Sequence, residues 1–177
     1  SDAPRYLLAF AVGNLLGPIV LGRFFDTIGR KQMISGCYLL AGALLAGTGF
    51  LFKQGLLTAT TQTILWSVIF FFASSAASAA YLTVSEIFPL ELRAQAIAFF
   101  FAIAQIFGAL GPVIFGALIG DHEHPDPGRL FLGYVVGAVV MAAGGVVEAL
   151  IGVKAERTAL EDIAHPLSQV TAPSKQE

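Results

Sequence analysis

Long apolar segments separated by short polar ones dominate this chain. Five of them are long enough to cross the hydrocarbon core of a bilayer, which takes about 20 mostly apolar residues in a helix. None alternates apolar and polar residues as a half-buried strand would. The pattern predicts an all-α integral membrane protein with five transmembrane helices and a polar C-terminal tail at 154–177. We expect the spans at residues 6–25, 33–52, 64–88, 94–119 and 130–153.

The composition agrees with a membrane environment. Hydrophobic residues make up 56% of the 177 residues and charged residues only 12%, whereas soluble domains carry about a quarter charged residues. A soluble domain of this size would leave too much apolar surface in water. The net charge of −2 gives no support for a nucleic-acid partner, and we expect none. The single cysteine, Cys37, excludes a disulfide within the chain.

The basic residues are divided unevenly between the two sides of the predicted bundle. Seven of the ten lysines and arginines fall on the side of Arg23 and Arg93, and three fall on the side of Lys53. Cytoplasmic segments of membrane proteins carry the excess of lysine and arginine. We therefore expect the side of Arg23 and the C-terminus to be cytoplasmic and the N-terminus to lie outside. The expected location is the plasma membrane, or the inner membrane of a bacterium.

A charged turn at residues 22–31 joins the first two spans. Asp26 lies at the C-terminal end of the first span, where the helix dipole disfavours an acid, so it needs a partner from elsewhere. Arg30 can pair bidentately with a carboxylate. Glu86, at the same level of the membrane, is the best candidate for that pair. We predict that Arg30 is paired and that Asp26 is satisfied only locally or not at all.

This turn resembles the loop signature of the major facilitator superfamily, Gly-x-x-x-Asp-basic-x-Gly-Arg-basic. Thr27 departs from the signature, because a basic residue usually follows the aspartate. The positions that match it are Gly22, Asp26, Gly29, Arg30 and Lys31.

A second segment, at residues 85–93, resembles the Ser-Glu-x-Phe-Pro-x-x-x-Arg signature of the sugar-porter-like branch of that superfamily. In the family this signature follows the tenth of twelve helices. The matching positions are Ser85, Glu86, Phe88, Pro89 and Arg93. Between the two signatures lie two predicted spans, which is the number that the family has there. The resemblance therefore implies that the chain corresponds to helices eight to twelve.

The resemblance implies a secondary active transporter that moves a small polar solute by alternating access, without enzyme activity and without a cofactor. Its partners would be the lipid bilayer, the solute and the N-terminal helical bundle of the same transporter. Proton coupling is compatible with this interpretation, although no residue identifies the proton carrier. Residues 77–81 replace the Gly-Pro-x-Pro-Trp element that is usual in sugar porters. A sugar, an organic acid or a related metabolite therefore remain open as the solute.

The resemblance also implies a conformational gate at the cytoplasmic edge. A cluster of charges would hold one conformation and release it during transport. The alternative is that these charges only anchor helix ends at the membrane surface. The expected gating residues are Asp26, Arg30, Glu86, Arg93, Gly22 and Gly29.

Polar side chains inside the spans are the candidates for solute contacts. Ser78 and Tyr81 share one helix face with Ser74, and Gln105 is a mid-membrane amide that needs a partner. In the family, the eighth, tenth and eleventh helices lie at the central cavity, which adds Asn14. For the serines, the alternative is a hydrogen bond to their own helix that permits tight packing. The expected solute-binding residues are Tyr81, Gln105, Ser78 and Asn14.

Small residues spaced four apart predict close contacts between helices, because lipid supplies no hydrophobic drive for helix association. Gly13 and Gly17 in the first span have this spacing.

Other functional classes have less support. His122 and His124 on the outer loop are too few for a metal site, and we expect none. The competing interpretation of the whole chain is a five-span membrane scaffold or accessory subunit without transport activity. That interpretation does not account for both loop signatures.

Overall fold

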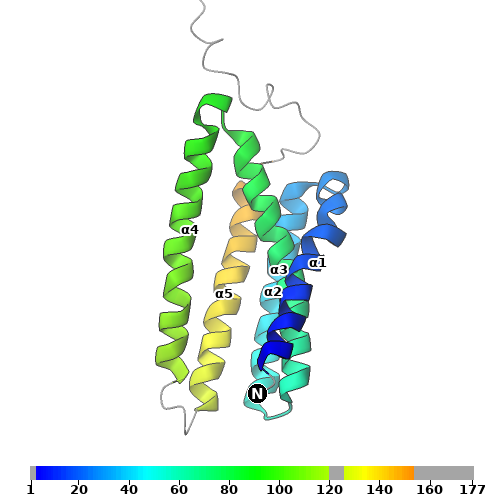
Figure 1. The fold of residues 1–177 in the computed structure, drawn as a ribbon, viewed down its shortest axis with the longest axis vertical. Helices are drawn as coiled ribbons and strands as arrows, with labels where there is room; N and C mark the ends of the chain where they lie inside the picture. The colour runs from blue at the N-terminus through cyan, green and yellow to red at the C-terminus, as the bar shows by residue number, and fades with distance from the viewer. Residues whose placement is uncertain (1–2, 120–125, 154–177) are drawn as a thin grey trace, which may run out of the picture.

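The structure, a computed structural model, describes residues 3–119 and 126–153. Five α-helices make up these residues, and successive helices run antiparallel (Figure 1). All five are long and apolar enough to cross a membrane. The predicted all-α fold is therefore confirmed, whereas the expected tail at 154–177 lies outside the described residues. The helices are α1 (Ala3–Thr27), α2 (Arg30–Lys53), α3 (Ala59–Ile87), α4 (Leu90–Ile119) and α5 (Pro127–Ile151).

The helices extend beyond the expected spans where polar residues continue the helix past its apolar part. α3 begins at Ala59 rather than at Ile64, because Thr58 and Thr61 form a capping box there. The Thr61 amide donates to Thr58 Oγ1 at 3.2 Å, and the Thr58 amide donates to Thr61 Oγ1 at 2.9 Å. These two bonds satisfy amides that the first turn of a helix leaves without partners.

The break between α3 and α4 is short and depends on a proline. Phe88 is extended, with φ −107° and ψ 143°, as expected for a residue that precedes a proline. α4 then begins at Leu90, directly after Pro89 and ahead of its expected start at residue 94. The two helices therefore meet at a sharp corner instead of a flexible loop.

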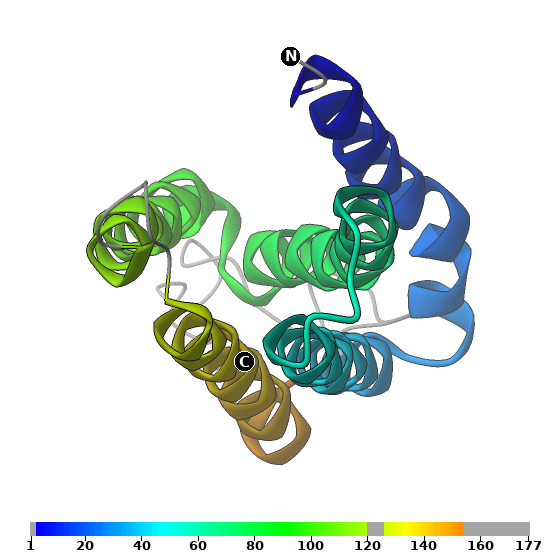
Figure 2. The same cartoon turned by 90° about the horizontal axis from the view of Figure 1, so that it is seen from below.

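Two helix pairs provide most of the packing, α2 with α5 and α1 with α3. α3 also packs on α2 and so connects the two pairs. Seen along the helices, α4 lies at the edge of the bundle beside α5 (Figure 2). No residue in the most apolar part of α4 is buried among the described helices, whereas 39% of the corresponding part of α2 is buried. Much of the surface of α4 is therefore left for lipid or for further helices.

Glycines allow the close approach of α1 to α3. A Cβ atom added at Gly13 would lie 2.7 Å from the carbonyl oxygen of Ser67, and one added at Gly17 would lie 2.1 Å from that of Phe71. Both contacts are with backbone, which cannot move aside without separating the helices. The predicted close contact at these two glycines is confirmed.

Candidate functional site

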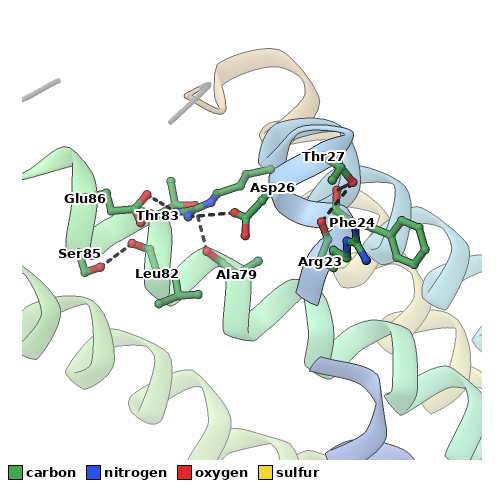
Figure 3. A network of polar contacts seen from close by, with 10 residues as sticks. Arg23, Phe24, Asp26, Thr27, Ala79, Leu82, Thr83, Ser85 and Glu86 are labelled. Atoms are coloured by element: carbon green, nitrogen blue, oxygen red, sulfur yellow. Dashed lines mark hydrogen bonds and ion pairs between the residues drawn. The ribbon is translucent and has the colours of Figure 1, made fainter. Parts of the chain in front are cut away.

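Arg30 lies at the centre of an ion cluster that joins three helix ends. Its Nη1 donates a hydrogen bond to Oε2 of Glu86, in the last turn of α3. Its Nη2 lies 3.3 Å from Oδ1 of Asp26, in the last turn of α1. Asp26 of α1 and Glu86 of α3 therefore contact the same guanidinium group from two different helices (Figure 3). The prediction that Arg30 is paired, with Glu86 as its partner, is confirmed.

The two carboxylates of the ion cluster differ in exposure. The side chain of Arg30 is 12% exposed and that of Glu86 is 22% exposed, whereas that of Asp26 is 65% exposed. Solvent and salt weaken an exposed ion pair far more than a partly buried one. The contact between Arg30 and Glu86 is therefore the stronger of the two, and it is the one that ties α2 to α3.

The turn at Gly29 aims Arg30 back towards α1 and α3. Gly29 has a φ of 122°, which L-residues with a side chain rarely adopt. α2 starts at the next residue, and the Met33 amide donates to the Gly29 carbonyl at 3.0 Å. Thr27, which stands where the family signature has a basic residue, donates its hydroxyl to the Arg23 carbonyl at 3.1 Å. The Thr27 side chain is therefore bonded to its own helix and not to the ion cluster.

A small cavity of about 130 Å³ adjoins the ion cluster between α1 and α3. Gly22, Asp26, Arg30 and Ser78 contribute to its lining. A Cβ atom added at Gly22 would meet no described atom within 4 Å, so packing within the described part does not require glycine there. This cavity places one expected solute residue, Ser78, next to three expected gating residues.

Arg93 forms no ion pair with the ion cluster in the part of the chain that the structure describes, and its role in the gate stays a prediction. Among residues 3–119 and 126–153, no ion pair links Arg93 to Glu86, and the buried Nε of Arg93 has no hydrogen-bond partner. Arg93 lies in the first turn of α4, beyond the corner at Pro89.

The four residues expected to contact a solute lie in different settings. The Tyr81 ring packs on α4, stacked on Phe101 with 4.3 Å between the ring centroids. Ser78 lines the small cavity beside the ion cluster. Asn14 and Gln105 are exposed on α1 and α4. The structure thus brings Ser78 to the ion cluster, places Tyr81 in a helix contact and leaves the two amides uncovered by the described helices.

Two serines of α3 that neighbour Ser78, Ser74 and Ser75, follow the alternative in part, because they bond to helix carbonyls. Ser75 Oγ donates to the Phe71 carbonyl of its own helix at 2.7 Å. Ser74 Oγ donates across to the Asn14 carbonyl of α1 at 2.8 Å. These hydroxyls therefore support the packing of α1 on α3.

Two polar contacts between helices could not be predicted from the sequence. Gln62 Nε2 donates to the Tyr134 hydroxyl at 2.8 Å, and Ser35 Oγ donates to the Gly145 carbonyl at 2.8 Å. The partners are 72 and 110 residues apart. The only signal in the sequence is a polar residue within an apolar helix, which does not name its partner.

These features define a multi-pass membrane bundle with an ion cluster at one end. The family model described as Major Facilitator Superfamily matches residues 6–170. Because the match covers most of the 177 residues, the chain belongs to this superfamily of transporters. The chain has no significant match among curated proteins or among solved structures.

Proposed function

We propose that the chain is the C-terminal portion of a secondary active transporter of the sugar-porter-like branch, with α1 to α5 as helices eight to twelve. It moves a small polar solute, such as a sugar, an organic acid or a related metabolite, by alternating access. The observation that carries the proposal is the ion cluster of Asp26, Arg30 and Glu86 in a chain of this superfamily. The cluster faces the cytoplasm of the plasma membrane or bacterial inner membrane, and the N-terminus of the chain lies outside.

The ion cluster acts as a gate because it joins the ends of α1, α2 and α3. Alternating access requires helices to rock against one another around a central site. A contact that ties three helix ends together favours one arrangement of those ends. Breaking the bonds of Arg30 releases α3 from the turn between α1 and α2 and so permits the other arrangement.

The exposed amides of Asn14 and Gln105 support a solute path along α1 and α4. An amide that faces hydrocarbon without a hydrogen-bond partner costs several kcal/mol in an alkane-like medium. The faces that carry Asn14 and Gln105 therefore turn towards a polar path and towards the N-terminal bundle of the same transporter. The uncovered surface of α4 is consistent with this contact.

Uptake by the full-length transporter in proteoliposomes tests the proposed gate, with labelled glucose and labelled succinate as probes. Glu86→Gln and Arg30→Ala are expected to lower the uptake rate about tenfold, which corresponds to about 1.4 kcal/mol. Arg23→Ala and Glu91→Gln are the matched controls, since each removes a charge near the same membrane edge but outside the ion cluster. Both controls should transport at nearly the wild-type rate.

Two outcomes would contradict the proposal in different ways. Wild-type uptake rates in Glu86→Gln and Arg30→Ala would refute the gating role while leaving transport intact. A wild-type protein that binds and moves none of the polar probes, although it is folded, would favour the membrane scaffold instead.

A further inference from the structure

A larger cavity lies at the end of the bundle opposite to the ion cluster. Its volume is about 520 Å³, within the range of roughly 300–1,000 Å³ that is typical of small-molecule sites. It lies where α2 ends and where α3 and α5 begin, and all five helices contribute to its lining. Those helix ends are at the bottom of Figure 1. The residues used below are Phe52, Gln62, Trp66, Tyr134 and Gly137.

The lining of this outer cavity is aromatic and aliphatic, with one polar pair. The Tyr134 ring lies 5.7 Å from the Phe52 ring and 6.3 Å from the Trp66 ring, measured between centroids. Gln62 Nε2 donates to the Tyr134 hydroxyl at 2.8 Å. No side chain in the lining carries a charge. The cavity therefore suits a neutral ligand, because a charged one would lose its hydration without gaining a counter-charge.

The polar pair keeps unused hydrogen-bonding capacity. The bond from Gln62 occupies a lone pair of the Tyr134 oxygen and leaves the Tyr134 O–H as a donor. It also leaves Gln62 Oε1 as an acceptor. One donor beside one acceptor matches a ligand hydroxyl, which both donates and accepts.

Packing fixes the position of Tyr134. The residue is only 7% exposed. A Cβ atom added at Gly49 of α2 would lie 2.5 Å from the Tyr134 Cβ, so a glycine is needed for Tyr134 to lie against α2. On the cavity wall, a Cβ atom added at Gly137 would meet Leu45 Cδ2 at 3.0 Å. Two glycines thus shape the site. Gly49 lets Tyr134 pack against α2, and Gly137 places no side chain on the cavity wall.

We propose that the outer cavity binds a neutral amphiphile from the bilayer, with its acyl chain against the aromatic lining and a head-group hydroxyl bonded to Gln62 and Tyr134. The hydrocarbon of the membrane is as apolar as the cavity, so burial alone gives little preference for a bound chain over a free lipid. The polar pair supplies the selectivity. Gln62 lies near the start of α3, which has 29 residues, and the ends of a membrane-spanning helix of this length reach the level of the lipid head groups.

The outer cavity is separate from the proposed solute path and gate. None of Asn14, Ser78, Tyr81, Gln105 or Arg30 lines it. Binding there does not depend on transport, so the two proposals can fail independently.

Quenching of Trp66 fluorescence tests the proposal, because Trp66 lines the cavity and is the single tryptophan of the chain. The full-length transporter, with any tryptophan outside the 177 residues replaced by phenylalanine, is placed in phosphatidylcholine nanodiscs, and a monoacylglycerol brominated on its acyl chain is titrated in. Bromine quenches indole fluorescence on contact. Saturable quenching at a low mole fraction is expected. The brominated methyl ester of the same acid, which has no hydroxyl, should bind about fivefold more weakly.

Variants identify the site. Tyr134→Phe should weaken binding about fivefold by removing the hydroxyl, and Gly137→Leu should abolish saturable quenching by filling the cavity. Tyr6→Phe, which removes a hydroxyl from a residue of α1 that does not line the cavity, should bind like the wild type. If Tyr134→Phe is unfolded by circular dichroism, Gln62→Leu provides the same test. Quenching that rises linearly with mole fraction and is equal in wild type and Gly137→Leu would overturn the proposal, since it would show only surrounding lipid.

Discussion

Arg30 should couple strongly to Glu86 and weakly to Asp26, although it contacts both carboxylates. The perturbation is a pair of double-mutant cycles. One combines Arg30→Gln with Glu86→Gln, and the other combines Arg30→Gln with Asp26→Asn. The Glu86 and Asp26 substitutions remove charge at nearly unchanged side-chain size, and Arg30→Gln removes the guanidinium with a shorter side chain. The coupling free energy from each cycle isolates one contact of the ion cluster.

The exposures set the two magnitudes. Arg30 and Glu86 are 12% and 22% exposed, and a hydrogen bond to a charged group contributes about 1.5–3 kcal/mol when it is shielded from water. Asp26 is 65% exposed, and exposed ion pairs give about 0.2–1 kcal/mol. We expect a coupling of about 2 kcal/mol with Glu86 and about 0.4 kcal/mol with Asp26.

The assay is reversible unfolding in mixed micelles of a mild detergent and dodecyl sulfate, followed by circular dichroism. The free energy of unfolding is measured for the wild type, the single variants and the double variants. Raising the salt concentration should reduce the Asp26 coupling first, because that pair is the more exposed. Equal couplings, or a larger coupling with Asp26, would refute the argument that burial decides which contact of Arg30 dominates.

Three further predictions concern packing and helix ends. Gly17→Ala should be less stable than Gly22→Ala by about 1–3 kcal/mol, because both gain the same helix propensity but only the former pushes against Phe71. Thr58→Ala should lower the free energy of unfolding by about 1 kcal/mol, because it removes the N-cap hydroxyl of α3, whereas Thr58→Ser keeps that hydroxyl and should be nearly as stable as the wild type. Ser35→Ala should cost about 1 kcal/mol by removing the bond to the Gly145 carbonyl of α5. The same unfolding assay checks all three, and equal stability of each variant and its reference would contradict the reasoning.

The helices could be predicted from the sequence because hydrocarbon thickness imposes a length on every apolar span. The boundaries were less predictable where a polar turn belongs to the helix. The start of α3 illustrates this, since hydropathy places it at Ile64 while the Thr58 cap places it at Ala59. A capping box is local chemistry at the helix end and does not change the hydropathy of the span that follows.

Contacts between helices could be predicted only where the sequence restricted the partners. Arg30 needed a carboxylate at one membrane edge, and Glu86 met that need. Whether Arg93 pairs with Glu86 could not be predicted, because charge and membrane level do not show which way the corner at Pro89 turns the chain. The contact of Gln62 with Tyr134 was not predicted, because its formation depends on how α3 and α5 rotate about their own axes.

The expected strength of the Arg30–Glu86 contact suits the proposed gate. A gate has to break in every transport cycle, so a contact that is too strong would trap one conformation. Each 1.4 kcal/mol changes the ratio of two conformations tenfold, and a coupling of about 2 kcal/mol changes it by about thirtyfold. Thermal motion can reverse a bias of that size, yet it suffices to set which face is normally closed.

Removing the contact between Arg30 and Glu86 should therefore change the balance between inward-open and outward-open states without unfolding the bundle. Replacing Glu86 by aspartate, which keeps the charge and shortens the reach towards Arg30, should give an intermediate balance.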